Sequence, residues 1–346
     1  MDSVDHDLDE WNQALNNTLV RPQPIPPYAL LIGAGFTAGI GGFLAQQMWE
    51  QIFNEHEISS SDILRERMLE NFNFEEIYES LIADGKKDLV ATFSRAINTA
   101  YDRLDRIVRR AHQEPVQLND LGSWLGRFGG QSFTDDHKGF LFSLNQDLFI
   151  ERMRRHAGLD TKIPGMPPAG QVQTIADHDG IRKVRIPKYV QPLQLSQELG
   201  RLNLIKLHGS CNWIDADDQE IMVIGGRKVS SIRRHNLLSS YFSLFKYVLN
   251  RPDMNLWVFG YSFADEHVNS AIINALQSNP TLKLFVVDLA RPDEFMKRFK
   301  SNELKPIKRA IRAYIPNSIR GIFQAGYTSV PYQQIDSLMY RQQYKG

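Results

Sequence analysis

Short apolar runs recur along the chain, and this repetition constrains the fold more than any other feature of the sequence. The runs cover residues 28–32, 139–144, 202–207, 255–259 and 282–287, and helical patterns lie between most of them. Their apolar residues are continuous rather than alternating, which is typical of strands covered on both faces of a sheet. Strands that alternate with helices predict an α/β fold with a doubly wound, mostly parallel sheet.

The first 27 residues lack this pattern. Four prolines fall within residues 21–27 and favour an extended backbone that cannot join the interior of a sheet. Trp11 and Leu15 lie four residues apart, which allows a short helix that docks on a partner. We therefore expect residues 1–27 to form a proline-ended N-terminal arm.

A long helical stretch interrupts the strand pattern. Between Leu89 and Arg110 the apolar residues recur at spacings of three and four, and Gly85 breaks the preceding helical pattern. We interpret residues 58–136 as a helical insertion. The sheet domain is then expected in residues 28–57 and 137–346.

Cysteine usage and the N-terminus restrict the class of protein. Cys211 is the single cysteine, which excludes a disulfide scaffold and any CxxC zinc or redox motif. The N-terminus is acidic and has no apolar stretch, unlike a signal or transit peptide. No apolar run approaches the roughly 18 residues of a membrane span. These features predict a cytoplasmic protein that does not associate with membranes.

Charge is balanced overall but unevenly distributed. The chain has 40 basic and 40 acidic residues, yet residues 1–80 hold 14 acids and 3 bases. Two solvated faces of opposite sign explain this split, and so do complementary patches that join subunits or a partner. The basic clusters are short and lack interleaved aromatic residues, so strong direct nucleic-acid binding is not expected.

Chemically active residues gather where the predicted strands end. In doubly wound sheets, ligands bind just beyond the carboxyl ends of the strands. The residues at these positions are Gly33, Ala34, Gly35, Phe36, Thr37, Asn145, Asp147, His208, Ser210, Gly260, Ser262 and Asp288. We take this set as the candidate site.

The glycine turn is the most specific member of the set. Residues 33–38 match G-x-G-x-x-A after a strand and before a helix, where a backbone can approach a pyrophosphate. A tight turn without a ligand is the alternative. No second strand ends at an acidic residue about 20 positions further on, so a standard dehydrogenase half-domain is disfavoured.

Each polar side chain has a chemical and a structural interpretation. Asp288 can accept from both hydroxyls of a ribose or cap a helix. His208 titrates near neutrality and can accept a proton, although a single strand-end histidine is more often structural. Asn145 can orient a water or a ribose hydroxyl, and Asp147 can accept from a carboxamide; both can also cap the helix expected over residues 148–156.

Four sequence blocks, in this order, resemble the sirtuin-like (SIR2-like) family, in its branch of bacterial anti-phage defence effectors without a zinc module. They are Gly33-Ala34-Gly35-Phe36-Thr37-Ala38-Gly39-Ile40, Asn145-Gln146-Asp147, Lys206-Leu207-His208-Gly209-Ser210 and Gly260-Tyr261-Ser262-Phe263-Ala264-Asp265-Glu266-His267. Each block stands at the end of a predicted strand. With Asp288 the likeness spans residues 33–288.

This resemblance implies a Rossmann-like NAD-binding domain with an inserted helical subdomain, and NAD as the substrate. It implies that His208 is the general base, that Asn145 positions water and the nicotinamide ribose, and that Asp147 contacts the nicotinamide carboxamide. It also implies that the glycine turn holds the pyrophosphate. Ser262 and Asp288 then lie on the adenosine side, and Ser210 and Gly260 complete the cofactor-binding set.

Two departures from the deacylating sirtuins narrow the expected reaction. Those enzymes carry a four-cysteine zinc module, which Cys211 alone cannot build. They also follow Gly-Ile with Pro-Asp-Phe-Arg, whereas Ile40 precedes residues 41–44, Gly-Gly-Phe-Leu. The defence branch shares both losses and cleaves NAD with water. The resemblance therefore implies an NAD+ glycohydrolase that releases nicotinamide and ADP-ribose and needs no metal.

Two further expectations concern the cell and the alternative function. An unregulated NAD hydrolase kills its own cell, as in abortive infection, so we expect activation by a partner or by assembly. Family resemblance suggests a separate sensor subunit (an ATPase, an argonaute-like protein or a nucleotide-sensing protein), a homo-oligomer, or both. The alternative is a non-catalytic regulatory module that binds NAD or ADP-ribose. Protein deacylation is the weakest hypothesis.

Overall fold

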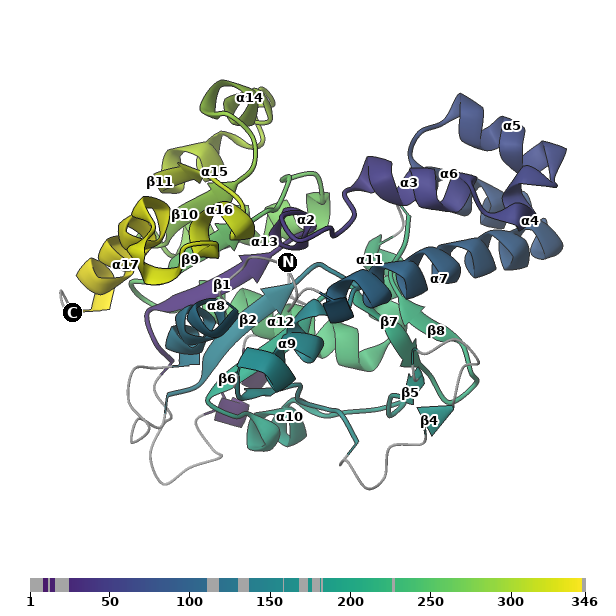
Figure 1. Cartoon of the computed structure of the whole chain (residues 1–346). Helices are drawn as coiled ribbons and strands as arrows, with labels where there is room; N and C mark the ends of the chain where they lie inside the picture. The colour runs from purple at the N-terminus through teal and green to yellow at the C-terminus, as the bar shows by residue number, and fades with distance from the viewer. Residues whose placement is uncertain are drawn as a thin grey trace.

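A seven-stranded parallel sheet forms the centre of the computed structural model (Figure 1). The structure describes residues 9–11, 13–15, 25–110, 118–129, 137–157, 159–167, 174–175, 181, 183–225 and 228–343. The strand order is β11-β10-β9-β1-β2-β6-β3, and every pairing is parallel. The strands are β1 (Tyr28–Ile32), β2 (Gly139–Ser143), β3 (Thr161–Lys162), β6 (Leu202–Lys206), β9 (Asn255–Phe259), β10 (Lys283–Asp288) and β11 (Ile311–Pro316). The predicted α/β, Rossmann-like architecture is confirmed.

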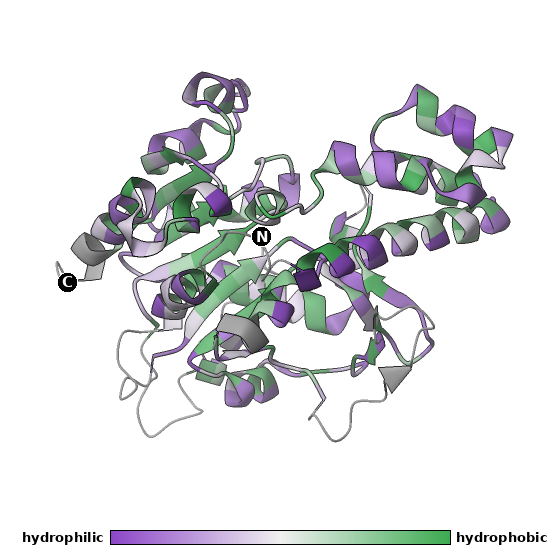
Figure 2. Ribbon diagram, viewed as in Figure 1, coloured by the Kyte–Doolittle hydropathy of each residue, from purple (hydrophilic) through white to green (hydrophobic). Residues whose placement is uncertain are grey.

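Helices cover both faces of this sheet. Successive residues of β1 point into two different cores, with Leu31 in one and Leu30 in the other. This explains why the strands are mainly apolar, as the hydropathy colouring shows (Figure 2). One face packs against α10 (Pro192–Glu198), α12 (Asn236–Leu249), α13 (Glu266–Ser278), α14 (Pro292–Lys297) and α15 (Lys305–Ala310). The other packs against α8 (Leu118–Gly126), α9 (Phe149–Ala157), α16 (Ile319–Phe323) and α17 (Val330–Gln343).

Five helices between β1 and β2 form a separate helical unit that extends from the sheet (Figure 1). They are α3 (Ala45–Phe53), α4 (His56–Ser59), α5 (Asp62–Glu70), α6 (Phe74–Ala83) and α7 (Lys87–Arg110). This unit has its own apolar core, to which α3 contributes Trp49 and α7 contributes Phe93. The second half of α7 instead packs on the sheet through Leu104 and Val108. The predicted break at Gly85 is confirmed, because Gly85 has a φ of +67° and separates α6 from α7.

A second, four-stranded sheet lies beside the site and was not predicted in full. Its order is β4-β5-β7-β8, formed by β4 (Thr174–Ile175), β5 (Lys183–Arg185), β7 (Gly209–Ile214) and β8 (Glu220–Met222). The strand β7 begins one residue after His208, where Gly209 has a φ of +73°. His208 therefore stands in a sharp turn between two strands.

The N-terminal segment packs on its own chain. Residues 9–11 and 13–15 are helical, and Trp11 is fully buried in the core on the α12 face of the sheet. Ser196 Oγ donates to the carbonyl of Ala14. In this structure the indole of Trp11 packs within its own chain and not against a partner. Residues 1–8, 12 and 16–24 lie outside the described residues. Within the described ranges, no helix combines the length and apolarity that a membrane crossing requires.

Candidate functional site

A cavity of about 720 Å³ opens at the carboxyl ends of β1, β2, β9 and β10. After β1 the chain forms β2, β3 and β6 on one side of that strand, and later β9, β10 and β11 on the other. Ligands of doubly wound folds bind at such a switch point, in pockets of roughly 300–1,000 Å³. The helical unit closes one side of the cavity with Leu44, Met48, Phe72, Phe74 and Glu75.

The glycine turn after β1 is locked to the end of β9. Gly35 N–H donates to the Gly260 carbonyl at 2.9 Å, and Gly33 N–H donates to the Phe259 carbonyl at 3.0 Å. A Cβ on Gly33 or Gly35 would approach the Gly260 backbone within 2.7–2.8 Å, closer than such atoms normally come. Backbone packing against Gly260 is therefore sufficient to require glycine at both positions. The turn opens only a four-residue helix, α2 (Gly35–Ala38), and the next helix, α3, begins at Ala45.

The loop after β2 places an unpaired amide in the cavity wall. Asn145 is 8% exposed, and its Nδ2 has no hydrogen-bond partner among the described residues. The Asn145 N–H donates to Ser143 Oγ at 3.1 Å, which fixes the backbone of the loop. Since a buried polar group without a partner is costly, Asn145 marks a position where a ligand or a water completes the structure.

Asp147 both caps a helix and lines the cavity, the two arrangements expected from the sequence. Its Oδ1 accepts from the Phe149 N–H at 2.9 Å, which is the predicted helix cap, here of α9. Its Oδ2 accepts from Thr37 Oγ1 at 3.4 Å, and the carboxylate also lines the cavity. Burial raises the pKa of Asp147, while Lys206 opposes that shift. Asp147 therefore links the glycine turn to the Asn145 loop.

A buried lysine behind the cavity connects the loops after β2 and β6. Lys206 is 1% exposed and donates to the Asp147 carbonyl at 2.5 Å, to Ser210 Oγ at 2.8 Å and to Glu151 Oε1 at 2.9 Å. Three acceptors in fixed positions satisfy all three ammonium protons. Lys206 thereby holds the segments that carry Asn145 and His208 at a constant separation.

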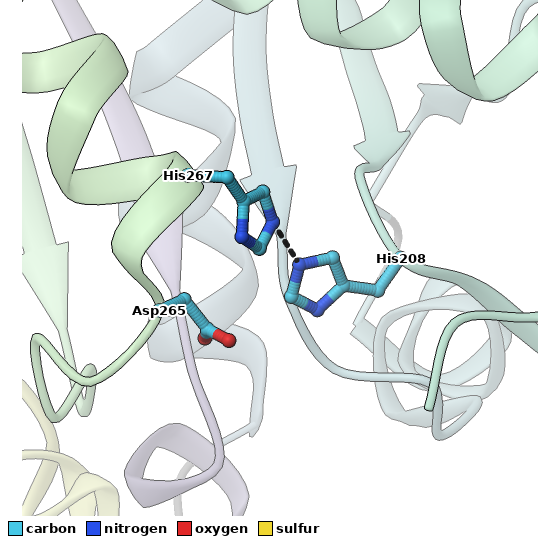
Figure 3. Close-up of side chains that lie close together, drawn as sticks. All are labelled: His208, Asp265 and His267. Atoms are coloured by element: carbon cyan, nitrogen blue, oxygen red, sulfur yellow. Dashed lines mark hydrogen bonds between the residues drawn. The ribbon is translucent and has the colours of Figure 1, made fainter. Parts of the chain in front are cut away.

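His208 faces a second histidine (Figure 3). Its Nε2 lies 2.8 Å from Nε2 of His267, and its ring also hydrogen-bonds to the Leu144 backbone. Burial lowers the pKa of His208 to about 3 and that of His267 to about 4, so both rings are neutral at pH 7. Because Nε2 faces His267, the nitrogen that donates to Leu144 is Nδ1. The lone pair of His208 is then on Nε2, and His267 donates to it.

Ion pairs connect this histidine pair to the helical unit. Asp265 lies beside both rings, and its Oδ1 is 2.5 Å from Lys228 Nζ on α11 (Lys228–Arg234). Lys228 also lies 3.0 Å from Glu75 Oε2 on α6. Burial raises the pKa of Glu75, and Lys228 opposes that shift. Burial also acts to raise the pKa of Asp265, but His208 and Lys228 outweigh it, so that this pKa is lowered overall. Glu75, Lys228 and Asp265 all line the cavity, so the helical unit is bonded to the site itself.

Asp288 already has a cationic partner. Its two oxygens accept from Arg298 at 2.8 and 3.1 Å, and its Oδ1 also accepts from the Ala290 N–H at 2.8 Å. The backbone contact closes the turn after β10 and caps no helix, because the helix that follows, α14, begins at Pro292 with Arg291 before it. Asp288 and Arg298 both line the cavity, so a ribose there meets an ion pair rather than a free carboxylate.

Most of the predicted residues meet in this one cavity. Those in its wall are Gly33, Ala34, Gly35, Asn145, Asp147, His208, Gly260, Ser262 and Asp288. Phe36, Thr37 and Ser210 are buried but are not among the described residues of the wall. Sequence reasoning gave no role to Lys206, Lys228, Asp265, His267 or Arg298, although Lys206, Asp265 and His267 stand within the blocks quoted above.

Comparison with known proteins identifies the domain. Residues 140–307 match the family model described as the SIR2-like domain. The match contains Asn145, Asp147, His208 and the residues after β9, while the glycine turn and the helical unit precede it. A search of curated proteins found no match. SIR2-like domains use NAD as substrate, so the match points to NAD-related activity. Residues 140–307 are therefore similar to a SIR2-like domain.

Proposed function

We propose that this protein hydrolyses NAD+ to nicotinamide and ADP-ribose in the cavity described above. The observation that carries the proposal is the buried Asn145 amide, which has no partner for Nδ2 among the described residues and shares a cavity with His208. NAD+ has a cationic nicotinamide leaving group on a ribose that can form an oxocarbenium ion. The protein must orient the dinucleotide and admit one water.

The reaction balances without an additional reactant. The bond between the anomeric carbon and the nicotinamide nitrogen breaks, and nicotinamide leaves with the bonding pair as a neutral base. The water oxygen bonds to the anomeric carbon, and its proton passes to His208 Nε2. A water bonded to that carbon is strongly acidic, so a weakly basic imidazole suffices. In this assignment Asn145 orients the water and the nicotinamide ribose, and Asp147 contacts the carboxamide.

The remaining roles follow the positions along the sheet edge. The glycine turn and Gly260 face the pyrophosphate, and Ser262 and the Asp288–Arg298 pair lie toward adenosine. Phe36, Thr37 and Ser210 support these groups from behind: Thr37 and Ser210 contact Asp147 and Lys206, respectively. We further propose that the enzyme depletes NAD as a toxic effector of anti-phage defence. A separate sensor subunit or self-assembly then switches it from a low basal rate to full activity.

One contact favours the second candidate, a non-catalytic module that binds NAD or ADP-ribose. His267 donates to the lone pair that His208 needs as a base. A module that signals by shape does not require that lone pair. The hydrolase must break this 2.8 Å hydrogen bond before the proton transfer.

Nicotinamide release separates the two candidates. The purified full-length chain is incubated with NAD+ over a range of protein concentrations, products are resolved by chromatography, and ADP-ribose binding is measured by calorimetry. We expect release by the wild type, none by Asn145→Ala or His208→Ala, and an unchanged rate for Asn302→Ala, which alters an exposed asparagine. Equal rates in all four proteins would refute the assignment. Binding without release supports the module.

A further inference from the structure

Three side chains beside the cavity have the composition of a transition-metal site. His208, Asp265 and His267 each offer one ligand atom, and these atoms lie within 4.8 Å of one another. Imidazole nitrogens and a carboxylate oxygen are ligands that Zn²⁺ accepts. Figure 3 shows the two ring nitrogens facing each other and the Asp265 carboxylate lying beside both rings. They come from two segments, the turn after β6 and the start of α13, which the fold holds together.

The spacing requires only small movements. Tetrahedral zinc at about 2.0–2.1 Å from each ligand places the ligand atoms roughly 3.3 Å apart. The two Nε2 atoms, now 2.8 Å apart, need to separate by about 0.5 Å. The carboxylate oxygen of Asp265 now lies within 4.8 Å of the ligand nitrogens. It needs to approach them by no more than about 1.5 Å. Rotation about side-chain bonds covers such a distance.

The surroundings of the rings also suit metal ligands. The second ring N–H of a ligating histidine normally donates to a carbonyl or carboxylate, and Nδ1–H of His208 donates to the Leu144 backbone. Both rings are neutral, so His208 already presents a lone pair on Nε2, and His267 presents one there once its proton moves to Nδ1. Lys228 Nζ contacts Asp265 Oδ1 and is the present counter-ion of that carboxylate. A metal ion bound by Asp265 therefore has to share the carboxylate with the Lys228 ammonium or displace the ammonium.

We propose that His208, Asp265 and His267 bind one Zn²⁺ ion, and that its binding inhibits NAD hydrolysis by occupying the lone pair of His208. The metal replaces the hydrogen bond between the rings. The expectation of no metal rested on the cysteine count and on the resemblance to NAD hydrolases, and this ligand set needs no cysteine. The inhibition rests on the proposed function, whereas the site itself does not.

Metal titration of the full-length protein tests the site without any turnover. Zn²⁺ is titrated in competition with a chromophoric indicator, and Co²⁺ is followed by its visible absorption. We expect one ion per chain and at least a tenfold loss of affinity in His267→Phe and Asp265→Asn. His56→Phe, which alters an exposed histidine on α4, should match the wild type. Equal affinity in all four proteins would overturn the site.

A second measurement uses only the wild type, in case a variant does not fold. Histidines are acylated with diethyl pyrocarbonate with and without Zn²⁺ and mapped by mass spectrometry. Protection of His267 but not His56 is expected, and equal modification of His267 in both samples would overturn the site. Zn²⁺ should also slow nicotinamide release. Full activity with zinc bound would refute the inhibition, whereas no release even without zinc would refute the proposed hydrolase and leave the binding result intact.

Discussion

Replacing Lys206 by methionine should destabilise the protein while leaving its surface unchanged. The ammonium is 1% exposed and donates to three acceptors, including Glu151 Oε1. Breaking a buried ion pair costs about 3–5 kcal/mol. Since the Glu151 side chain is 20% exposed and can regain hydration, we take the lower end, about 3 kcal/mol. Unfolding entropy of roughly 2.1 cal/mol/K per residue converts this into a Tm about 4 °C lower for the 346-residue chain.

Differential scanning fluorimetry of purified variants measures this change. Lys308→Met removes an exposed lysine on α15 and should leave the Tm within about 1 °C of the wild type. Adding Glu151→Gln to Lys206→Met removes the unpaired carboxylate and should restore about 1 kcal/mol of the loss. A Lys206→Met variant as stable as Lys308→Met would show that the three contacts contribute little, and the reasoning about this buried ammonium would fail.

Two further predictions concern the β9 turn and the pH dependence of turnover. Gly260→Ala should lower the Tm, because Gly260 has a φ of +66° and a Cβ would lie 2.2 Å from the Phe36 nitrogen; an unchanged Tm in scanning calorimetry would contradict this packing. Burial lowers the pKa of His208 to about 3, and the neutral ring is the proton acceptor, so activity is lost only below that pH. Initial rates should therefore be flat from about pH 5 to 8, and a fall centred near 6.5, the ordinary histidine pKa, would contradict it.

The sheet and most of the site could be predicted from the sequence. Continuous apolar runs indicate strands buried on both faces, and the carboxyl ends of parallel strands meet at one edge of a sheet. Polar residues that follow such runs are therefore expected to converge. Asn145 and His208 do line one cavity, although 63 positions separate them in the sequence.

The partners of these residues could not be predicted, because they depend on how helices pack against the sheet. The contact between His208 and His267 requires α13 to start beside the end of β6. Asp288 meets Arg298 only because α14 returns the chain to the sheet edge. The burial of Trp11 likewise arises from a tertiary groove that the arm sequence does not reveal.

The most direct test of the central claim is the stoichiometry of products from NAD+ in the presence of wild-type protein and Asn145→Ala. The account predicts that the wild type forms nicotinamide and ADP-ribose in equal amounts, and that Asn145→Ala forms neither while keeping the wild-type Tm. Nicotinamide release by Asn145→Ala at the wild-type rate would contradict the claim that this amide orients the reaction.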